Sequence, residues 1–196
     1  MTTNRLLTAA AIVWLVAAAV LEFGGVAPAD LGASPETLVD GEAWRLLTSS
    51  LLVEGELPAL QLAILAAATA AVIHRAGPRV WWAAALIGHV VPALVAYGSI
   101  GIAIALGSDS AERVADDWDF GVSCVLAAQA GVLFADALAR TRAARRARPA
   151  DVALLAVTSA AAVLSLVTIS WYGVEHPLAF AVGAAVLVVA RRRRSR

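Results

Sequence analysis

The chain has 196 residues, of which 61% are hydrophobic and 15% are charged, and its formal net charge is zero. A soluble domain is ordinarily about half apolar, so this composition excludes an ordinary soluble globular protein and indicates an integral membrane protein. The length allows one helical membrane domain over residues 1–196 and leaves little for a second domain. We therefore expect membrane lipids as partners and no nucleic acid.

The hydrophobic residues gather in six runs, and a helix needs roughly 20 apolar residues to cross a bilayer core. No cleavage site typical of a signal peptide follows the first run, so we expect it to remain as a helix. The third run is long enough to tilt, or to break near Pro92, Gly98 or Gly101. The predicted spans are residues 6–23, 57–73, 80–106, 120–139, 152–172 and 176–190.

Charges are sorted between the two ends of these spans. All 15 basic residues are Arg, and thirteen of them lie before the first run, between the second and third, between the fourth and fifth, and after the sixth. The positive-inside rule makes this side cytoplasmic. We therefore expect six helices with both termini in the cytoplasm, and a basic cytoplasmic tail at residues 191–196. Heavy use of Ala and Arg without Lys is typical of a GC-rich bacterium, which predicts a bacterial cytoplasmic membrane.

Metal and cofactor chemistry finds no support in the sequence. The single cysteine, Cys124, excludes an internal disulfide and a cysteine-based metal site. No set of His, Asp and Glu has the spacing of metal ligands, and no glycine-rich phosphate loop is present. We expect no metal and no cofactor.

Two side chains suited to nucleophilic catalysis begin predicted spans on the same side of the membrane. Ser123 begins the fourth span and His176 begins the sixth, and both spans run inward from the outer surface. A serine and an imidazole at matching depth are the minimum parts of a catalytic dyad inside a bilayer. Alternatively, Ser123 bonds a carbonyl one turn back in its own helix, and His176 faces water.

Other polar side chains lie within the predicted spans. His89 is deep in the third span, where an ionisable group is costly and marks a functional candidate; alternatively, it is neutral and bonds a neighbouring helix. Asp136, near the inner end of the fourth span, is expected to pair with the arginines that follow it. Gln61, His89 and Gln129 make only a weak case for a transporter or channel, because no broken helices or repeats accompany them.

Three short motifs occur in order along the chain. The first outer loop, between the first and second spans, contains Trp44 and Arg45; the fourth span begins Gly-Val-Ser-Cys at Gly121, and the sixth begins with His176. Together they resemble the rhomboid family of intramembrane serine proteases, which has a Trp-Arg segment before its second helix, Gly-x-Ser-Gly at its serine and His-x-x-Gly-x-x-x-Gly in the helix that carries the base. The resemblance extends from the first span to the sixth. The pattern Asp119-x-Gly121-x-Ser123, with His89 in the third span, is closer still to a divergent group of bacterial rhomboid-like membrane proteins.

The resemblance implies an all-α, six-helix rhomboid-like bundle that cleaves a substrate transmembrane helix near its outer end. Ser123 would be the nucleophile and His176 the base. Trp44 and Arg45 would stabilise a flap formed by the first outer loop. The small residues of the sixth span that would let it approach the fourth are Ala179 and Gly183, and the weaker candidates for support of the oxyanion are Gly121, Gln61 and His89.

The chain departs from the family around the serine and in the second helix. Cys124 stands where the family has Gly, and Ala127 where it commonly has an aromatic residue. Pro58 and Leu62 replace a His and an Asn that help to hold the oxyanion, and the loss of such donors typically lowers the rate by orders of magnitude. Two functions therefore stay open: an intramembrane serine protease, and an inactive rhomboid-like protein that binds transmembrane helices as clients.

Overall fold

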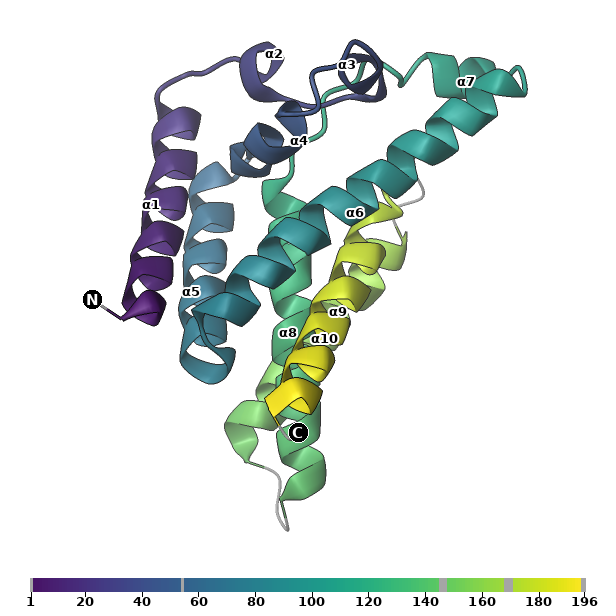
Figure 1. The fold of residues 1–196 in the computed structure, drawn as a ribbon. Helices are drawn as coiled ribbons and strands as arrows, with labels where there is room; N and C mark the ends of the chain where they lie inside the picture. The colour runs from purple at the N-terminus through teal and green to yellow at the C-terminus, as the bar shows by residue number, and fades with distance from the viewer. Residues whose placement is uncertain (1, 54, 145–147, 168–170, 195–196) are drawn as a thin grey trace.

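The computed structural model describes residues 2–53, 55–144, 148–167 and 171–194, and the regular elements of this part are helices (Figure 1). Within it, four helices are long and apolar enough to cross a membrane: α1 (Thr3–Phe23), α5 (Pro58–Ala76), α6 (Pro78–Ala105) and α8 (Val122–Ala143). The expected all-helical membrane protein is thus confirmed at this level. The fifth and sixth runs form α9 (Pro149–Val167) and α10 (Glu175–Arg194), and their assignment as spans stays a prediction.

Proline and glycine set the boundaries of the long helices. Pro58, Pro78 and Pro149 occupy the first positions of α5, α6 and α9, where their fixed φ suits a helix and no intrahelical N–H is lost. Gly77 separates α5 from α6 with φ +94°, a conformation that other residues rarely adopt. Pro92 lies inside α6 without ending it, so the alternative of a broken third span is wrong, and α6 instead runs obliquely across its neighbours (Figure 1).

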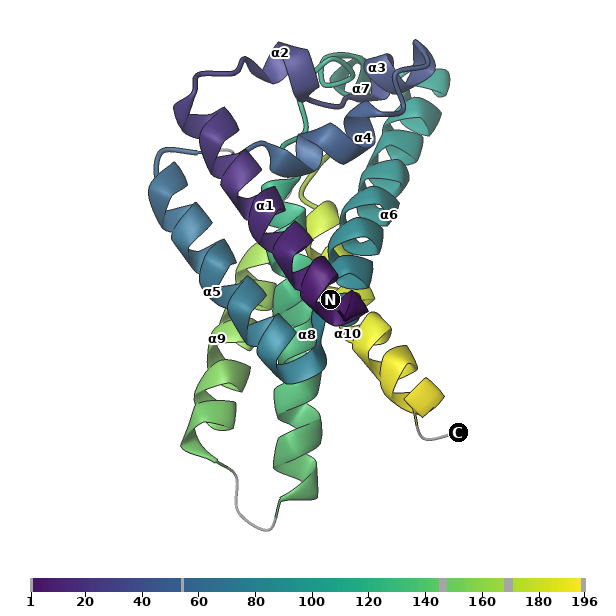
Figure 2. The same ribbon diagram turned by 60° about the vertical axis from the view of Figure 1, so that its left-hand side comes forward.

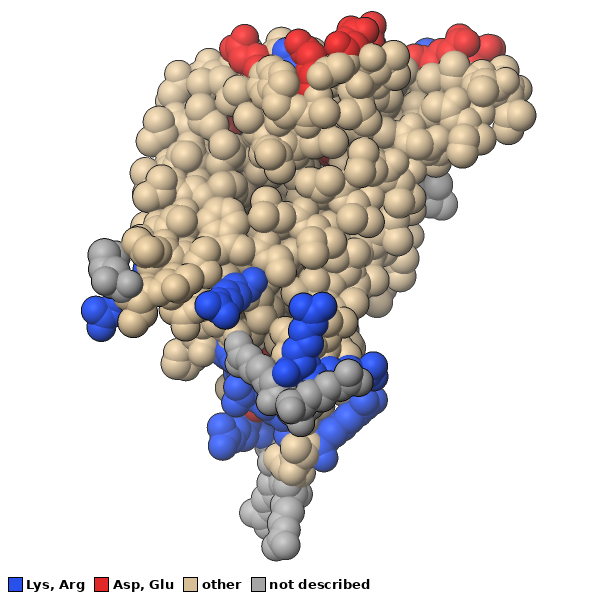
Figure 3. All heavy atoms as spheres, in the orientation of Figure 1, with Lys and Arg blue, Asp and Glu red and all other residues tan. Residues whose placement is uncertain are grey.

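The short elements gather at one end of the bundle and both termini lie towards the other (Figures 1 and 2). The loop end is acidic and the opposite end carries most of the arginines (Figure 3). Arg191 lies in the last turns of α10, which continues to Arg194, and residues 195–196 lie outside the described part; the basic cytoplasmic tail stays a prediction. The loop-end elements are α2 (Pro28–Leu31), α3 (Pro35–Val39), α4 (Arg45–Thr48), the 3-10 turn η1 (Ser49–Leu51) and α7 (Asp109–Glu112).

Helix α8 is central and packs against α5, α6, α9 and α10. Its contact with α10 is closed by glycines: a Cβ added to Gly183 would lie 1.8 Å from the carbonyl oxygen of Ala128, and one added to Gly131 would lie 2.0 Å from that of Phe180. Ala179, one turn before Gly183, is fully buried. Small residues let two helix backbones approach this closely, so α8 and α10 have little freedom to slide or separate.

Candidate functional site

Ser123 lies in the first turn of α8, at the loop end of the bundle. Its side chain is half-buried, and its hydroxyl donates a hydrogen bond to the carbonyl oxygen of Phe120 over 3.1 Å. This local bond is the one expected of an ordinary serine at a helix start. A single χ1 rotation would release the hydroxyl, so the bond is compatible with either interpretation of Ser123.

Backbone N–H groups at the beginning of α8 divide into two pairs. The first amides of any helix have no intrahelical acceptor. Gly121 and Val122 donate theirs to the carbonyl oxygens of Ser49 and Leu52 in the first outer loop, over 2.9 and 3.3 Å. The amides of Ser123 and Cys124 have no acceptor among the described residues. Two free donors therefore remain beside the Ser123 hydroxyl, the arrangement from which an oxyanion hole is built.

His176 is the second residue of α10, and it is half-buried. Its charge acts on Asp119, the loop residue two positions before Gly121. Burial raises the pKa of the Asp119 carboxyl above its usual range, against the opposing effects of a hydrogen bond from the Tyr97 hydroxyl (2.9 Å) and of nearby His176. The structure thus brings His176 and Asp119 near each other at the loop end of α8 and α10.

Buried polar side chains extend this region beyond the sequence predictions. Glu175 is 2% exposed, and its Oε2 lies 3.4 Å from the Cys124 sulfur, which donates to it, while its Oε1 has no partner among the described residues. Tyr97 and Glu175 are not among the site residues predicted from the sequence. A phenol inside an apolar span and an acid next to the candidate base were the available signals.

A serine–histidine hydrogen bond does form in the structure, between Ser49 and His89. The His89 Nε2 lies 2.7 Å from the carbonyl oxygen of Leu46 and 3.1 Å from the Ser49 hydroxyl. A carbonyl oxygen only accepts, so Nε2 carries the proton and cannot take one from Ser49. Both side chains are buried, at 0% and 1% exposed. This pair joins the first outer loop to α6, which agrees with the interpretation of His89 as a neutral hydrogen-bonding group.

Position 121 has room only for glycine, because the His89 ring packs against its backbone. A Cβ at position 121 would lie 2.2 Å from the Cε1 atom of the imidazole, so a larger residue does not fit. The ring therefore packs directly under the backbone that leads into α8. Gln61, the other candidate for oxyanion support, is half-buried on α5 and makes no side-chain hydrogen bond within the described part of the chain.

Arg45 holds the first outer loop in place. Its guanidinium donates to the carbonyl oxygens of Ala29 and Gly32, over 2.7 and 3.2 Å, and lies over the rings of Trp44 and Trp118. The segment between α7 and α8 binds the same loop, since the Asp119 amide donates to the carbonyl oxygen of Ala33. These contacts fix the two loops to each other directly before Ser123.

At the opposite end, Asp136 collects arginines from three helices. Arg140 pairs with it over 2.8 Å within α8, as the sequence predicts. Arg75 of α5 binds Asp136 over 2.8 Å and also Asp151 of α9, and Arg191 of α10 pairs with Asp136 as well. Asp136 is fully buried, so this ion cluster joins four helices and is structural.

Gln129 belongs to another structural network, where it accepts a hydrogen bond from Thr69, which in turn accepts one from Trp81.

Within the described ranges, no three His, Cys, Asp or Glu side chains are grouped so that they could hold a metal ion. Comparisons with protein-family models, with curated proteins and with solved structures find no match.

Proposed function

We propose that the chain is a rhomboid-like intramembrane serine protease with Ser123 as nucleophile and His176 as general base. The observation that supports this best is the beginning of α8, where a half-buried serine hydroxyl lies beside the free amides of Ser123 and Cys124. Helix α10, which carries His176 at its start, is packed backbone to backbone against the same helix. A nucleophile, a base on the adjacent helix and two oxyanion donors are the parts that acyl transfer needs.

The reaction would follow the usual course of serine hydrolases. Ser123 rotates away from the Phe120 carbonyl and gives its proton to the His176 imidazole while Oγ attacks the scissile carbonyl carbon. The amides of Ser123 and Cys124 stabilise the negative oxygen of the tetrahedral intermediate. The imidazolium then protonates the leaving amine, and a water molecule, activated by the same imidazole, hydrolyses the acyl-enzyme. Asp119, near His176, would stabilise the imidazolium electrostatically.

The backbone amides would take the place of the side-chain oxyanion donors that rhomboids have in the second helix and this chain lacks. The residues at Pro58 and Leu62 supply no side-chain donor, and Gln61 is not engaged near the serine by any hydrogen bond in the described residues. Amides at a helix start point along the helix axis and carry part of its dipole, so they can hold an oxyanion without a side chain. Because these amides are available, we favour the protease over the inactive client-binding protein.

The proposal includes the membrane topology. Six spans with both termini in the cytoplasm place the arginine-rich end inside and the acidic loop end outside, as the positive-inside rule requires (Figure 3). Ser123 then lies just below the outer surface of a bacterial cytoplasmic membrane. The substrate would be a transmembrane helix whose outer end unwinds beside α8.

One observation favours the second function, an inactive protein that binds transmembrane helices as clients. The Ser123 hydroxyl is bonded to the carbonyl of Phe120 in its own first turn, as a serine without catalytic function would be. This alternative makes no use of the free amides. The two functions differ in whether Ser123 reacts.

A fluorophosphonate probe tests the proposal on the purified full-length chain in detergent. We expect labelling of the wild type, none of Ser123→Ala, and labelling at least about 100-fold slower in His176→Ala, because general base catalysis supplies that much. Ser49→Ala is the matched control: it removes the serine that is hydrogen-bonded to His89, and it should label like the wild type.

The circular dichroism spectrum establishes that each variant keeps its helices. A helical wild type that resists the probe would overturn the protease assignment and favour the client-binding function. Labelling that persists in Ser123→Ala and disappears in Ser49→Ala would move the nucleophile to the first outer loop.

A further inference from the structure

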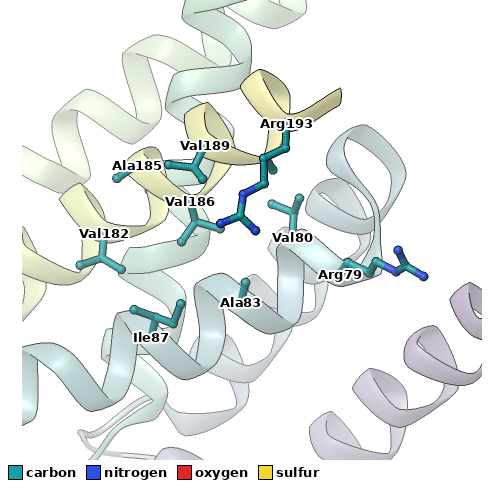
Figure 4. Close-up of a pocket in the computed structure, with 10 residues that line it drawn as sticks. Arg79, Val80, Ala83, Ile87, Val182, Ala185, Val186, Val189 and Arg193 are labelled. Atoms are coloured by element: carbon teal, nitrogen blue, oxygen red, sulfur yellow. The ribbon is translucent and has the colours of Figure 1, made fainter. Parts of the chain in front are cut away.

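A groove of about 700 Å³ runs between α6 and α10 (Figure 4). Gly183, which closes the contact with α8, is not among the residues that line the groove. Its walls are aliphatic, and the residues that shape them include Val80, Ala83 and Ile87 of α6 and Val182, Val186 and Val189 of α10. Such a concave apolar surface on a membrane protein faces hydrocarbon and needs an occupant that fills it.

Charge is confined to one end of this groove. Arg79 lies in the first turn of α6 and Arg193 in the last turn of α10, and both line the groove. Figure 4 shows the Arg193 side chain extending from α10 towards Val80 of α6, and the Arg79 side chain leaving α6 at the same end of the groove but pointing away from Arg193. The groove therefore has a cationic mouth and an aliphatic interior.

These two arginines differ from the three that meet at Asp136. Arg75, Arg140 and Arg191 are neutralised by Asp136, with Asp151 as a second partner of Arg75. Neither Arg79 nor Arg193 has a carboxylate partner among the described residues, and both side chains are exposed. Two uncompensated positive charges at the mouth of an apolar groove are complementary to an amphiphile with an anionic head.

The position in the bilayer identifies that amphiphile. The arginine-rich end of the molecule is the cytoplasmic end by the positive-inside rule, so the mouth lies at the level of the headgroups of the inner leaflet. Anionic lipids gather there and bind basic residues close to helix ends. A transmembrane helix would fill the aliphatic part but would leave the arginines without a counter-charge.

We propose that the α6–α10 groove binds an anionic phospholipid of the cytoplasmic leaflet, with its phosphate between Arg79 and Arg193 and an acyl chain along Ala83, Val186 and Ile87. The site is separate from Ser123, which lies at the opposite end of α8. It does not depend on whether Ser123 is catalytic. It does depend on the cytoplasmic placement of the arginine-rich end.

Native mass spectrometry of the full-length protein in detergent, titrated with phosphatidylglycerol and with phosphatidylcholine, tests the site. We expect the wild type to retain phosphatidylglycerol about tenfold more tightly than phosphatidylcholine, a preference that the double variant Arg79→Gln/Arg193→Gln loses. The matched control is Arg5→Gln/Arg142→Gln, which removes two exposed arginines from the same end of the molecule, outside the groove. It should keep the preference.

The apolar part of the groove is tested separately. Ala83→Phe and Ala185→Phe place a ring in the groove from α6 and from α10, and each should weaken binding of both lipids; two variants are used in case one of them unfolds. Glycerol phosphate, which has the anionic head without acyl chains, should compete poorly.

Three results would overturn the proposal. Equal loss of preference in the two arginine double variants would indicate general electrostatic attraction without a site. Full competition by glycerol phosphate would leave no role for the groove. A dimer that is abolished by Ala185→Phe would show that a second copy of the chain occupies it.

Discussion

The two faces of α10 are built in opposite ways. Towards α8, Gly183 and Gly131 bring the two backbones together so closely that a single added carbon would collide with a carbonyl oxygen. Towards α6, valines and alanines stand apart and leave a groove of about 700 Å³. The first face fixes where His176 stands relative to Ser123, whereas the second leaves an open groove. A small residue therefore has a different effect on each face: Gly183 allows close contact with α8, whereas Ala185 leaves space in the groove.

The largest change in the free energy of unfolding is expected at Gly183, on the closed face. Gly183→Leu forces α10 away from α8, because its Cβ alone would lie 1.8 Å from the Ala128 carbonyl oxygen. We expect a loss of about 3 kcal/mol or more in the free energy of unfolding, measured by circular dichroism during denaturation in mixed micelles. Ala185→Leu, two residues along the same helix on the groove face, should change it by less than about 0.5 kcal/mol. Similar losses in both variants would show that the two faces are equally packed.

A smaller effect is expected at the arginine-rich end of the same contact. Asp136→Asn removes the carboxylate that holds Arg75, Arg140 and Arg191. The arginines keep partial access to solvent, so we expect a loss of about 2 kcal/mol in the same unfolding measurement, less than for a fully buried pair. Arg140→Gln, which removes one exposed partner, should cost about 0.5 kcal/mol. An unchanged Asp136→Asn would mean that the glycine contact alone fixes α10.

The smallest effect concerns the loop end, where Asp119 meets Tyr97 and His176, with Glu175 close by. Burial raises the pKa of Asp119 above its ordinary value of 3.8, so the folded protein binds this proton more tightly than the unfolded chain does. The resulting stabilisation is complete below pH 3.8 and is lost as the pH rises through the raised pKa. The melting temperature of the wild type should therefore fall relative to that of Asp119→Asn as the pH rises above 3.8. Parallel curves for the two proteins would contradict this assignment.

Helix positions could be predicted well from the sequence. The start of α10 was predicted at His176 and lies at Glu175, and that of α8 was predicted at residue 120 and lies at Val122. The pair of Asp136 with Arg140 could also be predicted, because residues four apart share one face of a helix. In contrast, the helical continuation of α6 through Pro92 could not be decided, since it depends on how neighbouring helices accommodate the proline.

The candidate site was predictable in its residue types and less so in its contacts. Ser123 and His176 were found from charge order and span position, and their roles stay predictions. The bonds of His89 to Leu46 and Ser49 were not predicted, because they join residues 43 and 40 positions apart. The engagement of the Gly121 and Val122 amides by the first outer loop, which leaves those of Ser123 and Cys124 free, has no signal in a linear pattern.

What the sequence by itself determined is the membrane character, the helical segments and the separation of acidic from basic ends. Each of these follows from the transfer of a local stretch of side chains from water to lipid, which depends on composition and order alone. The tertiary structure decided which arginines Asp136 neutralises, which face of α10 is closed and which is open, and which amides remain free beside Ser123. These features depend on the register in which distant helices and loops pack, and that register is set by contacts between residues far apart in the chain.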